Sequence, residues 1–290
     1  MQFKHCKIKL LICKYKFSLI AIKIVYSQAK CLFTKFDPII SMETEIRIRA
    51  FRATDDYETC LKFYEGHKKV LEGHGIGQVT SSAADWMFSN AVFVIVVETM
   101  DGSKLYGGVR VHAADGKILL PIETATADMD PAIHDYVRYY AQNGTGELCG
   151  LWNSFEVRGL GIGSLFPARA AVVISEQMGL SSMFSLCSPA TVRFNKWIGS
   201  RVFTEVGNNG TFYYPKLDLL ATAVFLDEVK ELINAHPRER EKMLSLRQNL
   251  SSFATEKSPF KNISVNVHYE LGLQNIGMNE FKINYYNRAS

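Results

Sequence analysis

Alternating and periodic apolar residues define the first predicted elements of the chain. Apolar residues alternate with arginines over positions 46–50, which predicts a strand. Asp55 and Glu58 have the spacing of a capping box that opens a helix. The apolar face of this helix is predicted to carry Tyr57, Cys60, Leu61, Tyr64 and Leu71. The folded region is therefore expected to open with a strand and a helix.

A meander of antiparallel strands is predicted next. A short helix over residues 83–89 leads to an almost unbroken apolar run, residues 91–98, which is typical of a buried strand. Asp-Gly turns after this run and again at residues 115–116 predict two further strands, over residues 104–113 and 117–123.

The middle of the chain alternates helices with strands. Helices are predicted from Asp130-Pro131 to about Ala141, over residues 161–178, and from Ser188-Pro189 to Gly199. Strands are predicted at residues 147–153, 182–187, 201–206 and 217–226.

The last 64 residues, 227–290, have a different character. Two helical pieces are separated by Pro237, and strict alternation follows over residues 263–273. The alternation returns at Phe281, Ile283 and Tyr285, which predicts a terminal hairpin. Because two strands alone are marginal in water, this hairpin must cover or extend a sheet edge. We interpret the extension as a packing element or a homodimer contact rather than as part of the chemistry.

The first 41 residues hold eight lysines against Asp37 alone, a net charge of +7. The abrupt change to a well-patterned sequence at Met42 suggests that the natural start lies there, or that residues 1–41 form a disordered leader. The alternatives are a targeting signal and a membrane-surface anchor, since residues 17–26 make an apolar run after several lysines. Lys23 interrupts that run, and at about ten residues it is too short to span a bilayer. Three parts follow: this leader, a domain over residues 42–226, and the extension.

Charge and cysteine content exclude several classes of function. Residues 42–290 carry 25 basic and 28 acidic side chains, so no basic footprint for nucleic acid is expected, and no membrane partner either. The six cysteines form no C-x-x-C pair and no His/Cys cluster. We therefore expect a cytoplasmic protein in a reducing compartment, without a metal site.

A glycine-rich stretch separates the strand at residues 147–153 from the next long helix. Arg158, Gly159, Gly161 and Gly163 stand directly before an apolar helix. Glycines allow close approach of a ligand to the backbone, and the free amides at a helix start attract an anion such as a pyrophosphate. A dinucleotide fingerprint would need glycine in place of Ser164, and a Walker loop is absent. A glycine-rich turn without a ligand remains the alternative.

The stretch Arg158-Gly159-Leu160-Gly161-Ile162-Gly163 matches the R/Q-x-x-G-x-G/A signature and resembles the GNAT superfamily of N-acyltransferases. The pair Leu151-Trp152 and Glu156 agree with the family's flanking pattern. The resemblance covers residues 46–226 and is strongest between residues 147 and 199. It implies an α+β fold: a largely antiparallel twisted sheet, helices on both faces, and a splayed central pair of strands.

The resemblance also implies binding of acetyl-CoA or another acyl-CoA. The pyrophosphate is expected on the amides of Arg158, Gly159, Leu160, Gly161, Ile162, Gly163 and Ser164. Pantetheine is expected beside Leu151, Trp152 and Asn153, where the strand splays from residues 182–187. Two departures are Phe155 in place of the usual proline of this turn, and Pro167 near the fifth helical position. Pro167 is tolerated only if the helix starts late or its first turn is loose.

Acyl transfer to an amine needs a base that keeps the amine neutral. Glu147 stands where the histone-acetyltransferase branch of the superfamily has its catalytic glutamate, and burial beside Leu148 and Leu151 would raise its pKa. The reserve candidates are Glu123, predicted at the end of the preceding strand, and His112. A solvated Glu147 at the strand mouth is the structural alternative.

The leaving thiolate needs an acid, which the family commonly supplies as a tyrosine in the helix after the fifth family strand. Asn195 occupies that position here. Ser188, Cys187 or Tyr213 could substitute, or the thiolate could leave without a fixed acid. Cys187 as a covalent nucleophile is disfavoured because no histidine partner is evident.

The expected acceptor is a primary amine on a small molecule or peptide, and the insertion at residues 122–146, with several acidic residues, is expected to help shape its pocket. The main hypothesis is direct transfer of an acetyl group. One alternative is a synthase of long-chain N-acyl amino acids. Another is a non-catalytic acyl-CoA-binding module, suggested by Asn195 and the terminal hairpin.

Overall fold

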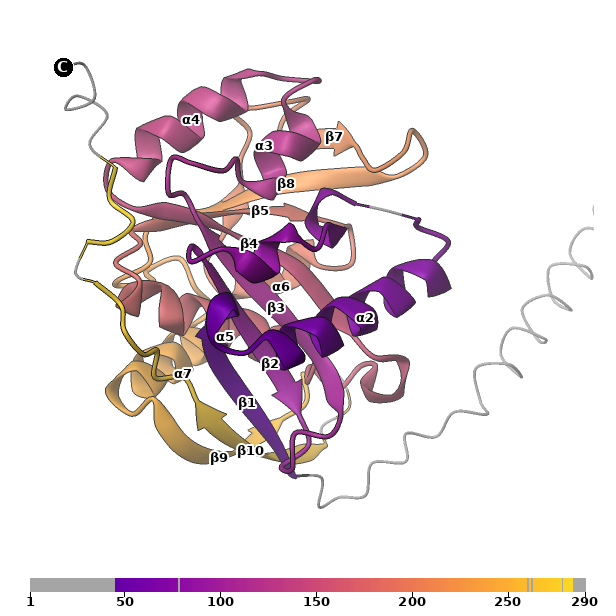
Figure 1. Cartoon of the computed structure of the whole chain (residues 1–290), viewed down its shortest axis with the longest axis vertical. Coiled ribbons are helices and arrows are strands. Elements are labelled where there is room, and N and C mark those ends of the chain that lie inside the picture. The colour runs from indigo at the N-terminus through magenta and orange to yellow at the C-terminus, as the bar shows by residue number, and fades with distance from the viewer. Residues whose placement is uncertain (1–44, 78, 260, 262, 278, 284–290) are drawn as a thin grey trace, which may run out of the picture. The chain divides into compact units, whose positions relative to one another are not determined.

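The computed structural model describes residues 45–283 except 78, 260, 262 and 278 (Figure 1). The leader at residues 1–41 and Tyr285 therefore lie outside the described residues. Within the described range, no helix is both long enough and apolar enough to cross a membrane.

One sheet of ten strands organises the described residues, in the order β6-β8-β5-β4-β3-β2-β1-β10-β9, with β7 paired to β8 (Figure 1). Only β4 with β5 and β1 with β10 pair in parallel; the other neighbours are antiparallel. The strands are β1 Glu45–Arg52, β2 Val92–Glu98, β3 Leu105–Ala113, β4 Thr145–Asn153, β5 Ser182–Cys187, β6 Arg201–Val202, β7 Thr211–Tyr213, β8 Leu220–Leu226, β9 Ser251–Lys257 and β10 Ser264–Glu270.

Helices cover both faces of this sheet. They are α2 Tyr57–Gly73, α3 Pro121–Thr126, α4 Ala132–Ala141, α5 Leu165–Gln177, α6 Val192–Trp197 and α7 Pro237–Gln248, with 3₁₀ turns at Ala53–Asp55, Thr80–Ser82, Asp85–Phe88 and Phe155–Val157. Neighbouring residues of a strand point to opposite faces. On β3, Gly108 faces Phe63 of α2 and Gly107 faces Gly163 at the start of α5, so α2 and α5 lie on opposite faces. The expected α+β fold with a largely antiparallel sheet is confirmed.

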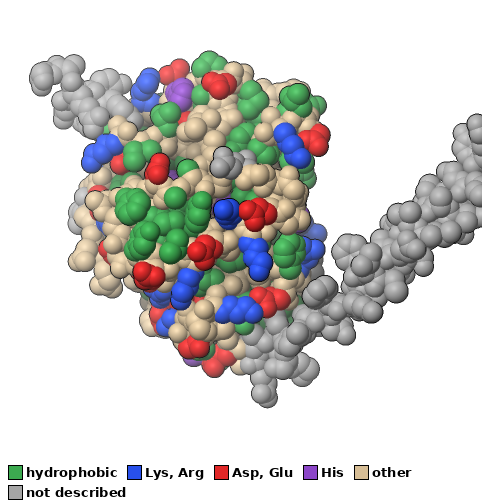
Figure 2. Space-filling model, turned by 45° about the vertical axis from the view of Figure 1, so that its right-hand side comes forward, with side chains coloured by type: hydrophobic (Ala, Val, Ile, Leu, Met, Phe, Trp, Pro, Cys, Tyr) green, Lys and Arg blue, Asp and Glu red, His purple; other side chains and the backbone are tan. Residues whose placement is uncertain are grey.

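The apolar core explains why the sequence pattern predicts β2. All seven residues of β2 are buried, because helices cover the strand on both sides. On the α2 face, Phe63 packs against Trp86 and Trp152 with ring centroids 5.7 and 5.8 Å apart. On the outside, acidic and basic side chains are interspersed over the face shown in Figure 2.

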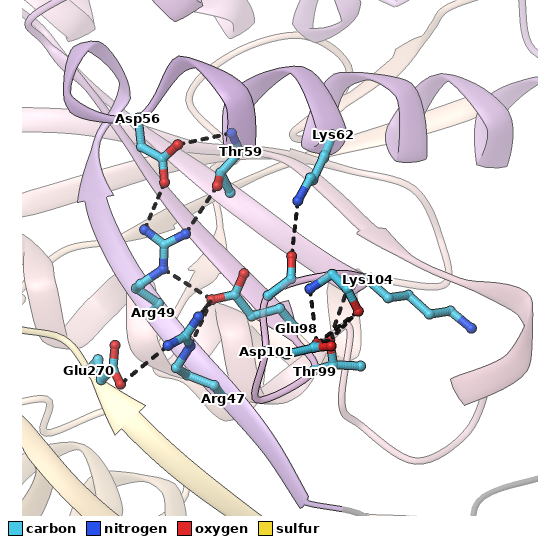
Figure 3. A network of polar contacts seen from close by, with 12 residues as sticks. Arg47, Arg49, Asp56, Thr59, Lys62, Glu98, Thr99, Asp101, Lys104 and Glu270 are labelled. Atoms are coloured by element: carbon cyan, nitrogen blue, oxygen red, sulfur yellow. Dashed lines mark hydrogen bonds and ion pairs between the residues drawn. The ribbon is translucent and has the colours of Figure 1, made fainter.

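The start of α2 differs from the prediction. Asp56, rather than Asp55, caps the helix: its Oδ1 accepts a hydrogen bond from the Thr59 amide at 3.0 Å. Arg49 of β1 holds this carboxylate at 2.9 Å and also binds Glu98, which is 1% exposed (Figure 3). The cap is therefore fixed by a tertiary ion pair that local spacing does not reveal.

The predicted apolar face of α2 is also wrong in part. The buried residues are Thr59, Cys60, Phe63 and His67, whereas Tyr57 is 47% exposed. The helix is rotated so that Phe63 meets Gly108 and the sheet.

The predicted strand over residues 117–123 is wrong. After the Asp115-Gly116 turn the chain enters α3, with Pro121 in its first turn. Proline has no amide hydrogen for a strand ladder but suits a helix start. Glu123 is consequently a helical residue, and its Oε2 accepts a hydrogen bond from the Leu120 amide at 2.8 Å.

Three boundaries in the second half of the chain also differ. The helix after the glycines begins at Leu165 rather than at residue 161, which puts Pro167 in the first turn, as its tolerance required. The next helix begins at Val192 rather than at Ser188, and the strand predicted from residue 201 ends at Val202. The short strand β7 was not predicted.

The terminal hairpin exists but pairs different residues. The observed hairpin consists of β9 and β10, and β10 extends the sheet by pairing with β1. Phe281 and Ile283 lie outside any strand; Phe281 packs on Phe93 with ring centroids 5.9 Å apart. A single helix begins at Pro237, instead of two pieces on either side of it. The homodimer contact stays a prediction.

Candidate functional site

The central strands β4 and β5 separate soon after they meet. Their parallel pairing covers only three residues of β4, Thr145 to Glu147. On its other edge β4 carries a bulge opposite Gly108 and Arg110, where Gly150 adopts φ +60°. A Cβ on Gly150 would lie 2.8 Å from Arg110 Nη2, so this position favours glycine. The bulge and the short pairing leave the end of β4 splayed from β5, as the resemblance implies.

The glycine-rich turn is pressed against this splayed end. Gly159 and Gly161 have φ +80° and +78°, a left-handed conformation that favours glycine. Leu160 lies between these two glycines and Ile162 follows them. Both side chains are fully buried and anchor the turn. A Cβ on Gly163 would lie 2.2 Å from Asn153 Oδ1 of β4. Each glycine therefore has a conformational or steric reason to be there.

The start of α5 offers amides to an anion. Ser164 is the N-cap residue, and no side chain caps the helix. Among the hydrogen bonds of the described residues, none is donated by the amides of Gly161, Ile162 or Gly163. Amides of this kind, together with the helix dipole, form a phosphate site. Arg158, which directly precedes the turn, is exposed, and its guanidinium lies 4.7 Å from the Phe155 ring centre.

The three β4 residues expected beside pantetheine do not all face the turn. Asn153 does, and its buried Oδ1 has no hydrogen-bond partner within the described part of the chain, so it is an acceptor suited to a ligand amide. The Trp152 side chain points to the opposite face, against Phe63 and Gly66 of α2. Leu151 is half-buried. Trp152 can therefore take part only through its backbone.

Glu147 is buried in the sheet face that α3 covers. Its side chain is 2% exposed, and its Oε2 accepts a hydrogen bond from the Ile122 amide at 2.6 Å. Burial raises its pKa to about 8, against the opposing effects of that hydrogen bond and of Arg110; Glu123 adds to the rise. The carboxyl is therefore mostly protonated at neutral pH and becomes a base above it.

The reserve base candidates lie close to Glu147. Glu123 is 4% exposed and its Oε1 is 2.8 Å from His134 Nδ1. His112 of β3 pairs directly with Glu147 across the strands. Burial, and secondarily Arg110, depress the pKa of His112 well below its ordinary value, so its imidazole stays neutral. The structure thus brings all three candidates to one region.

Two candidates for the acid, Cys187 and Ser188, lie at the end of β5, beside Asn195 of α6. Asn195 is 2% exposed, and its Nδ2 donates to Cys187 Sγ at 3.1 Å and to the Thr191 carbonyl at 3.2 Å. Ser188 is exposed, with Oγ 3.3 Å from Thr191 Oγ1. Burial raises the pKa of the Cys187 thiol to about 12, which makes a thiolate nucleophile unfavourable. Tyr213 lies on β7, which β8 separates from β5.

One contact at the site was missed by sequence reasoning. Ser258, which follows β9 in the terminal extension, donates from Oγ to the Gly159 carbonyl at 3.3 Å. No local signal connects residues 99 positions apart. In the described residues no group of three or more His, Cys, Asp or Glu side chains is placed to hold a metal ion.

Comparisons with known proteins find similarity among solved structures. No protein-family model matches the chain, and no curated protein matches it. Solved structures similar to it include an N-acyl amino acid synthase from uncultured soil microbes, with 15% identity, a TM-score of 0.46, and coverage of 64% of this chain and 93% of that one. A CoA-dependent acyl-homoserine lactone synthase, BjaI, has 11% identity, a TM-score of 0.45, and coverage of 81% of this chain and 96% of that one. A putative N-acetyltransferase from Lactobacillus plantarum has 15% identity, a TM-score of 0.40, and coverage of 63% of this chain and 97% of that one.

Proposed function

We propose that this protein is an acyl-CoA-dependent N-acyltransferase of the GNAT type that transfers an acetyl group to a primary amine. The observation that carries the proposal is the left-handed glycine turn at residues 159–163, which opens α5 beside the point where β4 leaves β5. The turn suits the pyrophosphate of CoA. The unpaired edge of β4, with Asn153 Oδ1, suits the amides of pantetheine.

The proposed reaction uses Glu147 as the general base. Its carboxylate takes a proton from the amine as the nitrogen attacks the thioester carbonyl, and the C–S bond then breaks to release the CoA thiol. The pKa of about 8 supports this role, because a base of that pKa holds the proton more strongly than an ordinary carboxylate.

The proton for the departing sulfur is proposed to come from Ser188 or from water. Ser188 is exposed and directly follows β5, the strand that forms the other wall of the splay. Asn195 is proposed to support the site structurally, because its amide already binds Cys187 and Thr191.

The proposal is tested by following thiol release from acetyl-CoA and longer acyl-CoAs with a panel of amino acids, diamines and peptides. We expect amine-dependent release that is fastest with the acetyl donor, and an amide product by mass spectrometry. Faster release with long chains would favour a long-chain synthase. Calorimetric CoA binding without turnover of any acceptor would favour the binding module, and absence of binding would contradict both.

A further inference from the structure

The turn of the C-terminal hairpin lies against the glycine turn. Ser258 Oγ donates to the Gly159 carbonyl at 3.3 Å and accepts from the Lys261 amide at 2.9 Å. The Pro259 ring covers Gly161, since a Cβ there would lie 2.7 Å from Pro259 Cδ. Residues about a hundred positions further along the chain therefore form one wall of the glycine turn.

The side chain of Lys261 extends over Gly159. A Cβ on Gly159 would lie 3.2 Å from Lys261 Cε and 3.9 Å from Nζ. The lysine is exposed, and in the part of the chain that the structure describes no carboxylate lies within ion-pair distance of its ammonium. A solvent-facing cation thus stands beside Gly159, the first glycine of the turn.

The hairpin is held in this place by a buried ionic cluster. Arg169 of α5 donates to Glu239 of α7 at 2.7 Å and to Glu256 of β9 at 2.8 Å, and to the Tyr269 hydroxyl of β10 at 3.2 Å. Arg169 stands on α5, the helix that directly follows the glycine turn. The hairpin turn and that anion site are therefore fixed to the same helix.

We propose that Lys261 binds a phosphate group of acyl-CoA at the glycine turn, so that the C-terminal hairpin forms part of the co-substrate site. The proposal rests on the function proposed above. An ammonium is a point charge that attracts phosphate oxygens, and it adds to the helix dipole and to Arg158 around the same turn. This gives the extension a role in binding, beyond the packing expected from its sequence.

The test compares Lys261→Met and Lys261→Arg with wild type, using acetyl-CoA and acetyl-pantetheine, which lacks the phosphates of the nucleotide half. We expect Lys261→Met to raise the KM for acetyl-CoA about five- to tenfold with little change in kcat, and Lys261→Arg to restore most of the affinity. Neither variant should alter the reaction with acetyl-pantetheine.

Lys230→Met is the charge-matched control. Lys230 is exposed, and its carbonyl accepts from Arg247, which also binds Val172 in the second half of α5, away from the glycine turn. This variant should leave the KM for acetyl-CoA unchanged.

Calorimetric titration with CoA separates the two proposals. If wild type binds CoA and Lys261→Met binds it equally well, the role of Lys261 is wrong while the proposed function stands. An equal loss with acetyl-pantetheine would also contradict a phosphate contact. If wild type binds no CoA, the proposed function fails and the role of Lys261 fails with it.

Discussion

Glu147 and Glu123 both accept hydrogen bonds from backbone amides at the start of α3. The Ile122 amide donates to Glu147 at 2.6 Å, and the Leu120 amide donates to Glu123 at 2.8 Å. The two carboxyl groups interact, and Glu123 contributes to the raised pKa of Glu147. Helix α3, which the sequence pattern did not predict, thus positions the candidate base.

We first predict the effect of Glu147→Gln on catalysis. The amide keeps an oxygen for the Ile122 amide but cannot accept the proton, so kcat/KM should fall about 10²- to 10³-fold while CoA affinity stays near wild type. The wild-type rate should rise with pH up to about 8, where the Glu147 carboxyl ionises, and then level. An unchanged rate and pH profile in the variant would rule out Glu147 as the base.

The same carboxyl should make stability depend on pH. Its pKa is raised from 4.5 to about 8 in the folded state, so the stability that its protonated form contributes is complete below pH 4.5 and is lost as pH rises towards 8. Glu147→Gln removes this dependence and should be more stable than wild type by about 2–4 kcal/mol at pH 8.5.

Urea unfolding at pH 5 and pH 8.5 measures this difference. Glu65→Gln, a change at an exposed site on α2, is the control and should follow the wild-type pH dependence. If Glu147→Gln lost stability between the two pH values as steeply as wild type, the buried carboxyl would not be the source.

The Arg169 cluster should be the most sensitive ionic site in the fold. Arg169→Met leaves the buried Glu239 and Glu256 carboxylates without their shared cation and should cost about 3–5 kcal/mol of unfolding free energy. Arg201 also binds two carboxylates but is 40% exposed, so Arg201→Met should cost about 1 kcal/mol or less. Chemical denaturation of both variants checks the contrast, which equal losses would contradict.

The parts of the fold that sequence predicted well depend on local pattern. The buried run of β2 and the glycine turn have signatures within a few residues, and both appear in the structure. The prediction of a strand over residues 117–123 was wrong because it gave the apolar content of the segment more weight than the proline that starts α3. The hairpin partner was misassigned because β9 lacks an apolar buried face: its one buried residue, Glu256, is a carboxylate that binds Arg169, 87 positions away.

The predictions for the candidate site also divide into local features, which the sequence showed, and tertiary ones, which it did not. The motif located the candidate anion site, and strand alternation puts Trp152 and Asn153 on opposite faces, but which of the two faces the glycine turn followed only from the positions of α2 and α5. The contact between Lys261 and Gly159 could not be predicted from local pattern, because it joins two turns that are far apart in the sequence. β10 pairs with β1 at the sheet edge, and the hairpin turn lies against the glycine turn.

The glycine turn provides the last prediction, through two glycines of similar conformation at the two ends of α5. Gly161 has φ +78° and Gly179, just after the helix, has φ +70°. A Cβ on Gly161 would lie 2.7 Å from Pro259, whereas nothing lies within 4 Å of a Cβ on Gly179. Alanine at either position should cost about 1 kcal/mol or more through backbone strain. Only Gly161→Ala should also weaken CoA binding, by about tenfold in Kd, because it displaces the amides that we propose bind the phosphates. Calorimetric titration of both variants tests this, and equal CoA affinity in the two would show that the turn at residues 159–163 does not bind CoA.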